Sequence, residues 1–78
     1  MKTVKISLNS IDKVKSFVNT VALFNCDFDI ISGRYVIDAK SIMGIFSLDL
    51  GKTLELCIHE TNDIDTIMEK LTPYIVEA

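Results

Sequence analysis

The residues of this chain best suited to chemistry are a serine, Ser41, and the one histidine, His59. Ser41 directly precedes a short apolar segment, and a serine in that position is typical of a helix N-cap. Its hydroxyl would lie where unpaired backbone N–H groups converge and where the helix dipole favours an anion. The position suits a phosphate group, so Ser41 is a candidate phosphorylation site. An ordinary N-cap worth about 1 kcal/mol is the simpler interpretation, and both roles are compatible.

Three large apolar side chains follow this serine, namely Ile42, Met43 and Phe46. A thioether beside aliphatic and aromatic groups suits a surface that accepts several protein partners. The alternative is that a small domain uses these residues to fill its core. The segment is apolar nearly all round, so periodicity does not separate the two interpretations. We expect at least one of the three to be buried.

The sequence gives little support for other catalytic sites or for a metal site. Cys57 and His59 share one face of a predicted strand, which we expect to face solvent, but two ligands are too few for zinc. A Cys–His nucleophilic pair would need an orienting third group and a cleft. Cys26 and Cys57 do not form a CxxC motif, so we expect reduced thiols. The chain also lacks a glycine-rich phosphate loop, and we expect no metal, no cofactor and no enzyme activity.

The composition is that of one small folded domain, which we assign to residues 1–78. Hydrophobic residues make up 49% of the chain, enough for a packed core. The net charge is -3 and there is no basic stripe, which argues against nucleic-acid binding. No apolar run is long enough for a membrane span and no targeting segment is recognised, so we expect a cytoplasmic protein. The oligomeric state is not indicated.

Periodicity predicts four strands and three helices in the order β-α-β-β-α-β-α. Strands are indicated where apolar and polar residues alternate, and helices where apolar residues recur every three or four positions. Such an order favours an α+β fold, in which an antiparallel sheet carries its helices on one face. The strands are expected over residues 3–8, 27–30, 35–37 and 53–59, and the helices over residues 11–24, after Ser41 and over residues 64–71.

The segment Lys40-Ser41-Ile42-Met43-Gly44, followed by a hydrophobic pair and Ser47-Leu48, resembles the regulatory-serine segment of HPr. HPr is the small phosphocarrier of the bacterial phosphoenolpyruvate–sugar phosphotransferase system, and the whole chain fits an HPr-length domain. The resemblance implies an HPr-like open-faced β-sandwich whose four strands lie in the spatial order first, fourth, second, third. It also implies an HPr kinase/phosphorylase-like kinase that modifies Ser41 with ATP, and a sugar-responsive transcriptional regulator that binds the product.

The phosphocarrier site is where the sequence departs from the family. In the family a His, followed two residues later by Arg, opens the first helix, and the corresponding positions here are Ser10 and Asp12. A serine ester transfers its phosphate far less readily than a phosphoimidazole, and Asp12 would repel the phosphate that the family Arg balances. We therefore predict an HPr-like regulatory protein without His phosphocarrier activity, comparable to the catabolite-repression HPr paralogue. The alternatives are phosphotransfer through an atypical acceptor such as His59, and a purely structural interaction domain.

Overall fold

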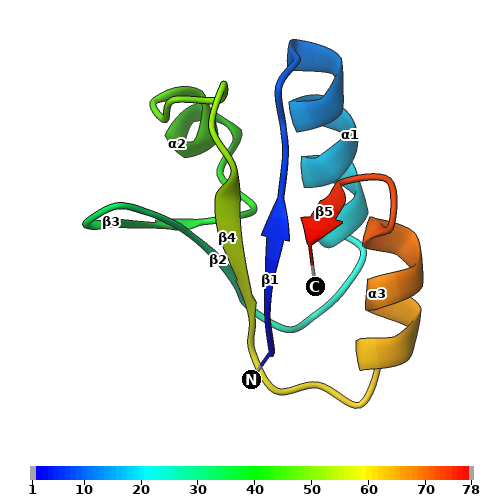
Figure 1. Cartoon of the computed structure of the whole chain (residues 1–78). Coiled ribbons are helices and arrows are strands. Elements are labelled where there is room, and N and C mark those ends of the chain that lie inside the picture. Colours follow the sequence, from blue (N-terminus) through cyan, green and yellow to red (C-terminus); the bar gives the residue numbers. More distant parts are fainter. Residues whose placement is uncertain (1, 78) are drawn as a thin grey trace.

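The structure is a computed structural model that describes residues 2–77. Five strands and three helices lie within this range (Figure 1). The strands are β1 (Lys2–Ile6), β2 (Phe28–Ser32), β3 (Tyr35–Asp38), β4 (Leu54–Ile58) and β5 (Ile75–Glu77), and the helices are α1 (Ile11–Val21), α2 (Ile42–Phe46) and α3 (Ile64–Leu71). Among residues 2–77, no helix has both the length and the apolar character that a membrane crossing requires.

The strands form one antiparallel sheet in the order β3-β2-β4-β1-β5. The predicted order first, fourth, second, third is confirmed, and so is the α+β class. The predicted number of four strands is wrong, because β5 pairs with the outer side of β1, with Lys5 opposite Glu77 and Ile6 opposite Ile75. A strand of three residues is too short to show a period of two, so only its pairing with β1 reveals it.

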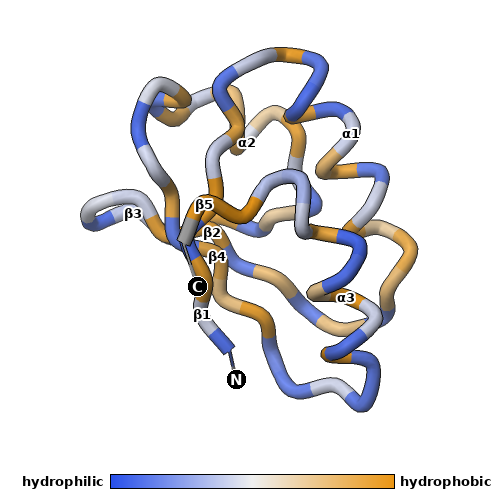
Figure 2. Tube along the Cα trace, turned by 45° about the vertical axis from the view of Figure 1, so that its right-hand side comes forward, coloured by the Kyte–Doolittle hydropathy of each residue, from blue (hydrophilic) through white to orange (hydrophobic). Residues whose placement is uncertain are grey.

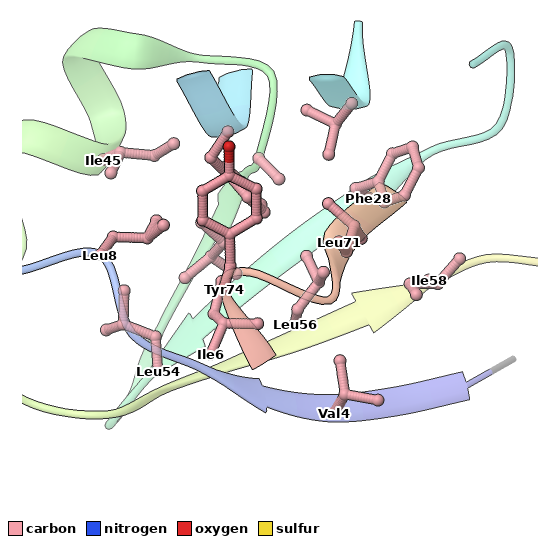
Figure 3. Close-up of a cluster of buried hydrophobic side chains, with 14 of the residues drawn as sticks. Val4, Ile6, Leu8, Phe28, Ile45, Leu54, Leu56, Ile58, Leu71 and Tyr74 are labelled. Atoms are coloured by element: carbon pink, nitrogen blue, oxygen red, sulfur yellow. The ribbon is translucent and has the colours of Figure 1, made fainter. Parts of the chain in front are cut away.

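The helices cover one face of the sheet, and the core lies between the two layers (Figure 1). Alternate strand residues point into this core, as Val4 and Ile6 do on β1 and Leu54, Leu56 and Ile58 do on β4. Figure 3 shows these side chains meeting others from the C-terminal part of the chain. Figure 2 shows that hydrophilic residues gather at the tip of the β2–β3 hairpin and in the connection before α3.

The first helix begins where the sequence predicts and ends earlier. Ser10 is its N-cap, and the Ser10 hydroxyl accepts a hydrogen bond from the Lys13 backbone N–H at 3.2 Å. The predicted helix reached residue 24, whereas α1 ends at Val21. The residues beyond Val21 form tighter turns, in which the Phe24 N–H donates to the Val21 carbonyl. Such turns satisfy the last carbonyl groups of a helix without extending it.

Candidate functional site

Ser41 is the N-cap of α2, as its position in the sequence predicts. Its Oγ accepts a hydrogen bond from the Gly44 N–H at 3.2 Å, and its own N–H donates to the Asp38 carbonyl at 3.0 Å. The residue is half-buried, so its hydroxyl lies at the border between the helix start and solvent. The arrangement satisfies one of the N–H groups that a helix start leaves unpaired.

The apolar residues of α2 divide between surface and core. Met43 is 76% exposed and Phe46 is 37% exposed, so both contribute to an apolar surface. Ile42 is half-buried and packs against the core. We expected at least one of these three to be buried, but the fully buried residue of the helix is Ile45. We call Ile42, Met43 and Phe46 together the α2 surface.

Lys40, the cationic residue directly before Ser41, directs its ammonium group away from Ser41 and toward the segment after α1. The Lys40 ammonium donates to the Phe24 carbonyl at 2.8 Å and lies 5.8 Å from the centre of the Phe28 ring. The Lys40 backbone N–H donates to Asp38 Oδ1 at 2.9 Å. Lys40 therefore connects the start of α2 to the segment that follows α1. A negative charge added at Ser41 would have the Gly44 N–H as its nearest identified donor.

The predicted positions of the family's phosphocarrier site lie at the start of α1. Ser10 is exposed at the N-cap, and Asp12 is exposed in the first turn. In Figure 1 the start of α1 and helix α2 lie at the same end of the sheet. The two candidate sites therefore share one end of the molecule.

His59 directly follows β4, whose C-terminal end lies at the end of the sheet away from α2 (Figure 1). Its Nε2 is 2.7 Å from Asp29 Oδ2 on β2, and its backbone N–H donates to the Asp27 carbonyl at 3.0 Å. Residue patterns alone do not show that Asp29 contacts His59, because this contact depends on the register between β2 and β4. That register places Asp29 opposite Cys57, two residues before His59.

The alternation of β4 predicts that Cys57 faces solvent, and this prediction is wrong. Cys57 is only 7% exposed. The reason is its place on a central strand, where Thr3 of β1 lies on one side and Asp29 of β2 on the other. Cys57 and the half-buried Cys26 are both free thiols. Within residues 2–77, no three His, Cys, Asp or Glu side chains are grouped closely enough to hold a metal ion.

Comparison with known proteins identifies the fold. No protein-family model and no curated protein matches the chain. Among solved structures, HPr-C-His from Thermoanaerobacter tengcongensis is 28% identical with a TM-score of 0.77, covering 94% of this chain and 89% of that one. The phosphocarrier protein HPr from Bacillus anthracis str. Ames is 29% identical with a TM-score of 0.73, covering 95% and 93%.

A histidine-containing phosphocarrier protein of Mycoplasma has the same fold at 17% identity, with a TM-score of 0.69 over 92% of this chain and 86% of that one. All three neighbours match nearly end to end, so the likeness concerns the whole domain and not a shared motif. The strand order, the placement of the helices and these similarities all indicate the same fold. The chain has the HPr-like fold and is similar to HPr phosphocarrier proteins over nearly its whole length.

Proposed function

We propose that this chain is a cytoplasmic regulatory or binding protein of the sugar phosphotransferase system, without His phosphocarrier activity, and that phosphorylation of Ser41 changes its affinity for a protein partner. One observation carries the proposal. Ser41 is the N-cap of α2, and the exposed side chains of Met43 and Phe46 follow it on the same short helix. A switchable charge would thus lie beside an apolar surface.

The rest of the chain supports the absence of a phosphate relay. Ser10 stands at the N-cap of α1, with Asp12 in the first turn, where a carboxylate would oppose a bound phosphate. The one histidine, His59, has its Nε2 in contact with the Asp29 carboxylate. A phosphoryl group on Nε2 of His59 would meet that carboxylate, which disfavours transfer to this atom electrostatically.

Phosphorylation would act mainly through a partner. It adds about two negative charges and three acceptor oxygens at the start of α2. The Lys40 ammonium is bonded to the Phe24 carbonyl, so the new charge stays available to an Arg or Lys of the partner. The switch requires that the partner bind the two forms with different affinity, and a tenfold difference corresponds to about 1.4 kcal/mol.

The proposed partners follow from the same surface. An HPr kinase/phosphorylase-like kinase would modify Ser41 with ATP, and a sugar-responsive transcriptional regulator would bind the phosphorylated chain. Both would contact the α2 surface. Because Met43 is 76% exposed, truncating it removes contact area without opening a cavity in the core.

The first experiment incubates the chain with ATP and an HPr kinase and measures its intact mass. We expect a gain of one phosphoryl group, which the Ser41→Ala variant loses. Ser47→Ala is the matched control, because Ser47 is an exposed serine at the other end of α2 whose hydroxyl donates to the Gly44 carbonyl. An unmodified chain, or one modified at Ser47 instead, would refute the proposal.

The second experiment measures binding of the regulator by calorimetry. Phosphorylated chain should bind at least about tenfold more tightly than unmodified chain, within the usual range of such couplings. Met43→Ala should weaken the phosphorylated complex, whereas Val76→Ala, an exposed control on β5, should not. Equal binding by wild type, Ser41→Ala and Ser41→Asp would favour the purely structural interaction domain.

Phosphotransfer through His59 is the remaining alternative. The Asp29 carboxylate contacts Nε2 and can orient the imidazole ring, so the acceptor would be the other ring nitrogen, Nδ1. Incubation with phosphoenolpyruvate and enzyme I tests it. We expect no acid-labile phosphate on the wild-type chain. An acid-labile phosphate that the His59→Gln variant loses would establish the alternative instead.

A further inference from the structure

One border of the sheet is a mostly apolar strand, and none of residues 2–77 pairs with its outer side. β3 is the last strand in the order β3-β2-β4-β1-β5 and reads Tyr-Val-Ile-Asp. Tyr35 and Val36 are each 65% exposed. Natural edge strands are commonly protected by charged side chains, proline or a bulge. β3 has no lysine, proline or bulge, and its one charged residue is Asp38 at its end. Such an edge can accept another strand.

The direction of the backbone groups follows from one hydrogen bond. The Ala39 N–H donates to the Phe28 carbonyl of β2 at 2.9 Å. Along an antiparallel strand, successive residues direct their N–H and C=O groups alternately toward the neighbouring strand and away from it. Ile37 and Tyr35 therefore face β2, and the N–H and C=O groups of Val36 face the free edge.

Helix α2 leaves the outer side of Val36 open, whereas the Asp38 carbonyl already accepts a hydrogen bond from the Ser41 N–H at 3.0 Å. The helix packs on the helix-covered face of the sheet, where a β-carbon added to Gly44 would be 2.6 Å from Ile37 Cγ2. Ile37 lies opposite Ile30, which is fully buried, so the contact belongs to the core side of β3. The outward-facing backbone of Val36 is one residue away and points along the sheet.

The charges that flank Val36 are self-complementary. Arg34 lies two residues before it and Asp38 two residues after it. Among residues 2–77, Arg34 forms no ion pair, and Asp38 lies directly opposite a second carboxylate, Asp29 of β2. Like charges in directly opposed positions repel, so Asp38 would gain from a nearby cation.

We propose that β3 pairs antiparallel with β3 of a second copy of this chain. Val36 lies opposite Val36 of the second copy, and the two residues exchange both backbone hydrogen bonds. This register places Arg34 of each copy opposite Asp38 of the other, so one two-fold axis creates two ion pairs. The five-stranded sheets then join into one continuous sheet. The proposal is independent of the phosphorylation of Ser41.

The charges around Val36 favour a second copy of this chain as the partner of β3. An isologous contact requires that one patch complement itself across a two-fold axis, and the Arg34–Val36–Asp38 pattern does so. A contact between strands of four residues is small, so we expect a weak dimer in rapid exchange with monomer. Its formation should depend on concentration and weaken at high salt.

The experiment is sedimentation equilibrium of wild type, Arg34→Glu, Asp38→Lys and an equimolar mixture of the two variants. Each variant alone brings like charges together twice, so its dimerisation should weaken by about tenfold. In the mixture every facing pair is again of opposite charge, so the mixed dimer should recover wild-type affinity. Circular dichroism checks that both variants remain folded, since each position is exposed.

Two further variants locate the contact. Val36→Lys should abolish association, and Val76→Lys, a matched change on the opposite edge strand β5, should not. Wild-type chain that remains monomeric at its highest soluble concentration would overturn the proposal. So would a mixture that associates no better than its two components, or an association that Val76→Lys removes and Val36→Lys preserves.

Discussion

Gly44 of α2 lies directly against Ile37 of β3, so close that a β-carbon on Gly44 would be 2.6 Å from Ile37 Cγ2. The same added carbon would be 3.1 Å from Ser41 Oγ. The Cγ2 methyl is attached to the branched β-carbon of Ile37, so it cannot move far without moving the strand. The absent side chain of Gly44 therefore sets how closely α2 and its N-cap approach the sheet.

Gly44→Ala should destabilise the protein by roughly 1–2 kcal/mol. Overpacking costs about 1–3 kcal/mol, and the better helix propensity of alanine offsets up to about 1 kcal/mol of this. Urea denaturation measures the free energy of unfolding. Gly51→Ala is the control, because its added carbon would meet only the exposed Asp49 carboxylate at 3.3 Å, and we expect a change within about 0.5 kcal/mol.

A double-mutant cycle assigns this cost to the contact. In an Ile37→Ala background the Cγ2 methyl is gone, so Gly44→Ala should cost less than in wild type. An equal cost in both backgrounds would mean that the glycine is needed for another reason. The cycle uses the same urea measurement.

Tyr74→Phe should lower the free energy of unfolding by about 0.5–1.5 kcal/mol. The Tyr74 hydroxyl is hydrogen-bonded to the Ser16 hydroxyl of α1, and the Tyr74 ring lies edge-on to Phe17 with centroids 5.5 Å apart. The variant keeps the ring contact and loses the hydrogen bond between α1 and the chain after α3. Tyr35→Phe, which changes an exposed ring on β3, should have no measurable effect.

The two thiols should differ in reactivity toward iodoacetamide. Cys57 is 7% exposed at the centre of the sheet, whereas Cys26 is half-buried in the connection before β2. Modification needs access to the sulfur, so native Cys26 should react first and Cys57 should react at a comparable rate only after unfolding. Peptide mass spectrometry of timed samples measures both rates. Faster native labelling of Cys57 would contradict its burial.

Restoring the family's residues at the start of α1 should restore phosphate transfer. The double variant Ser10→His with Asp12→Arg places an imidazole at the N-cap of α1 and a cation in its first turn. We expect it to accept an acid-labile phosphate from phosphoenolpyruvate through enzyme I. The single variant Ser10→His should accept less, because Asp12 would remain beside the phosphate. Labelling of the wild type but not of the double variant would show that the predicted correspondence of positions is wrong.

The local features of the fold and of the site were readable from the sequence. Alternation around Val4 and Ile6 predicts β1, and the positions of Ser10 and Ser41 predict two N-caps, all of which the structure contains. These features depend on a few neighbouring residues, because a cap bonds to an N–H three positions later and a strand face repeats every second residue. The sheet order came from the family resemblance and is confirmed.

Contacts between distant segments decided the rest. The burial of Cys57 and the pairing of His59 with Asp29 depend on the register of β4 between its neighbours. The three residues of β5 form a strand because they pair with the outer edge of β1. In the uniformly apolar α2, packing on the core buries Ile45 and leaves Met43 outside. Which apolar group faces solvent depends on what lies opposite it, and a linear pattern does not contain that information.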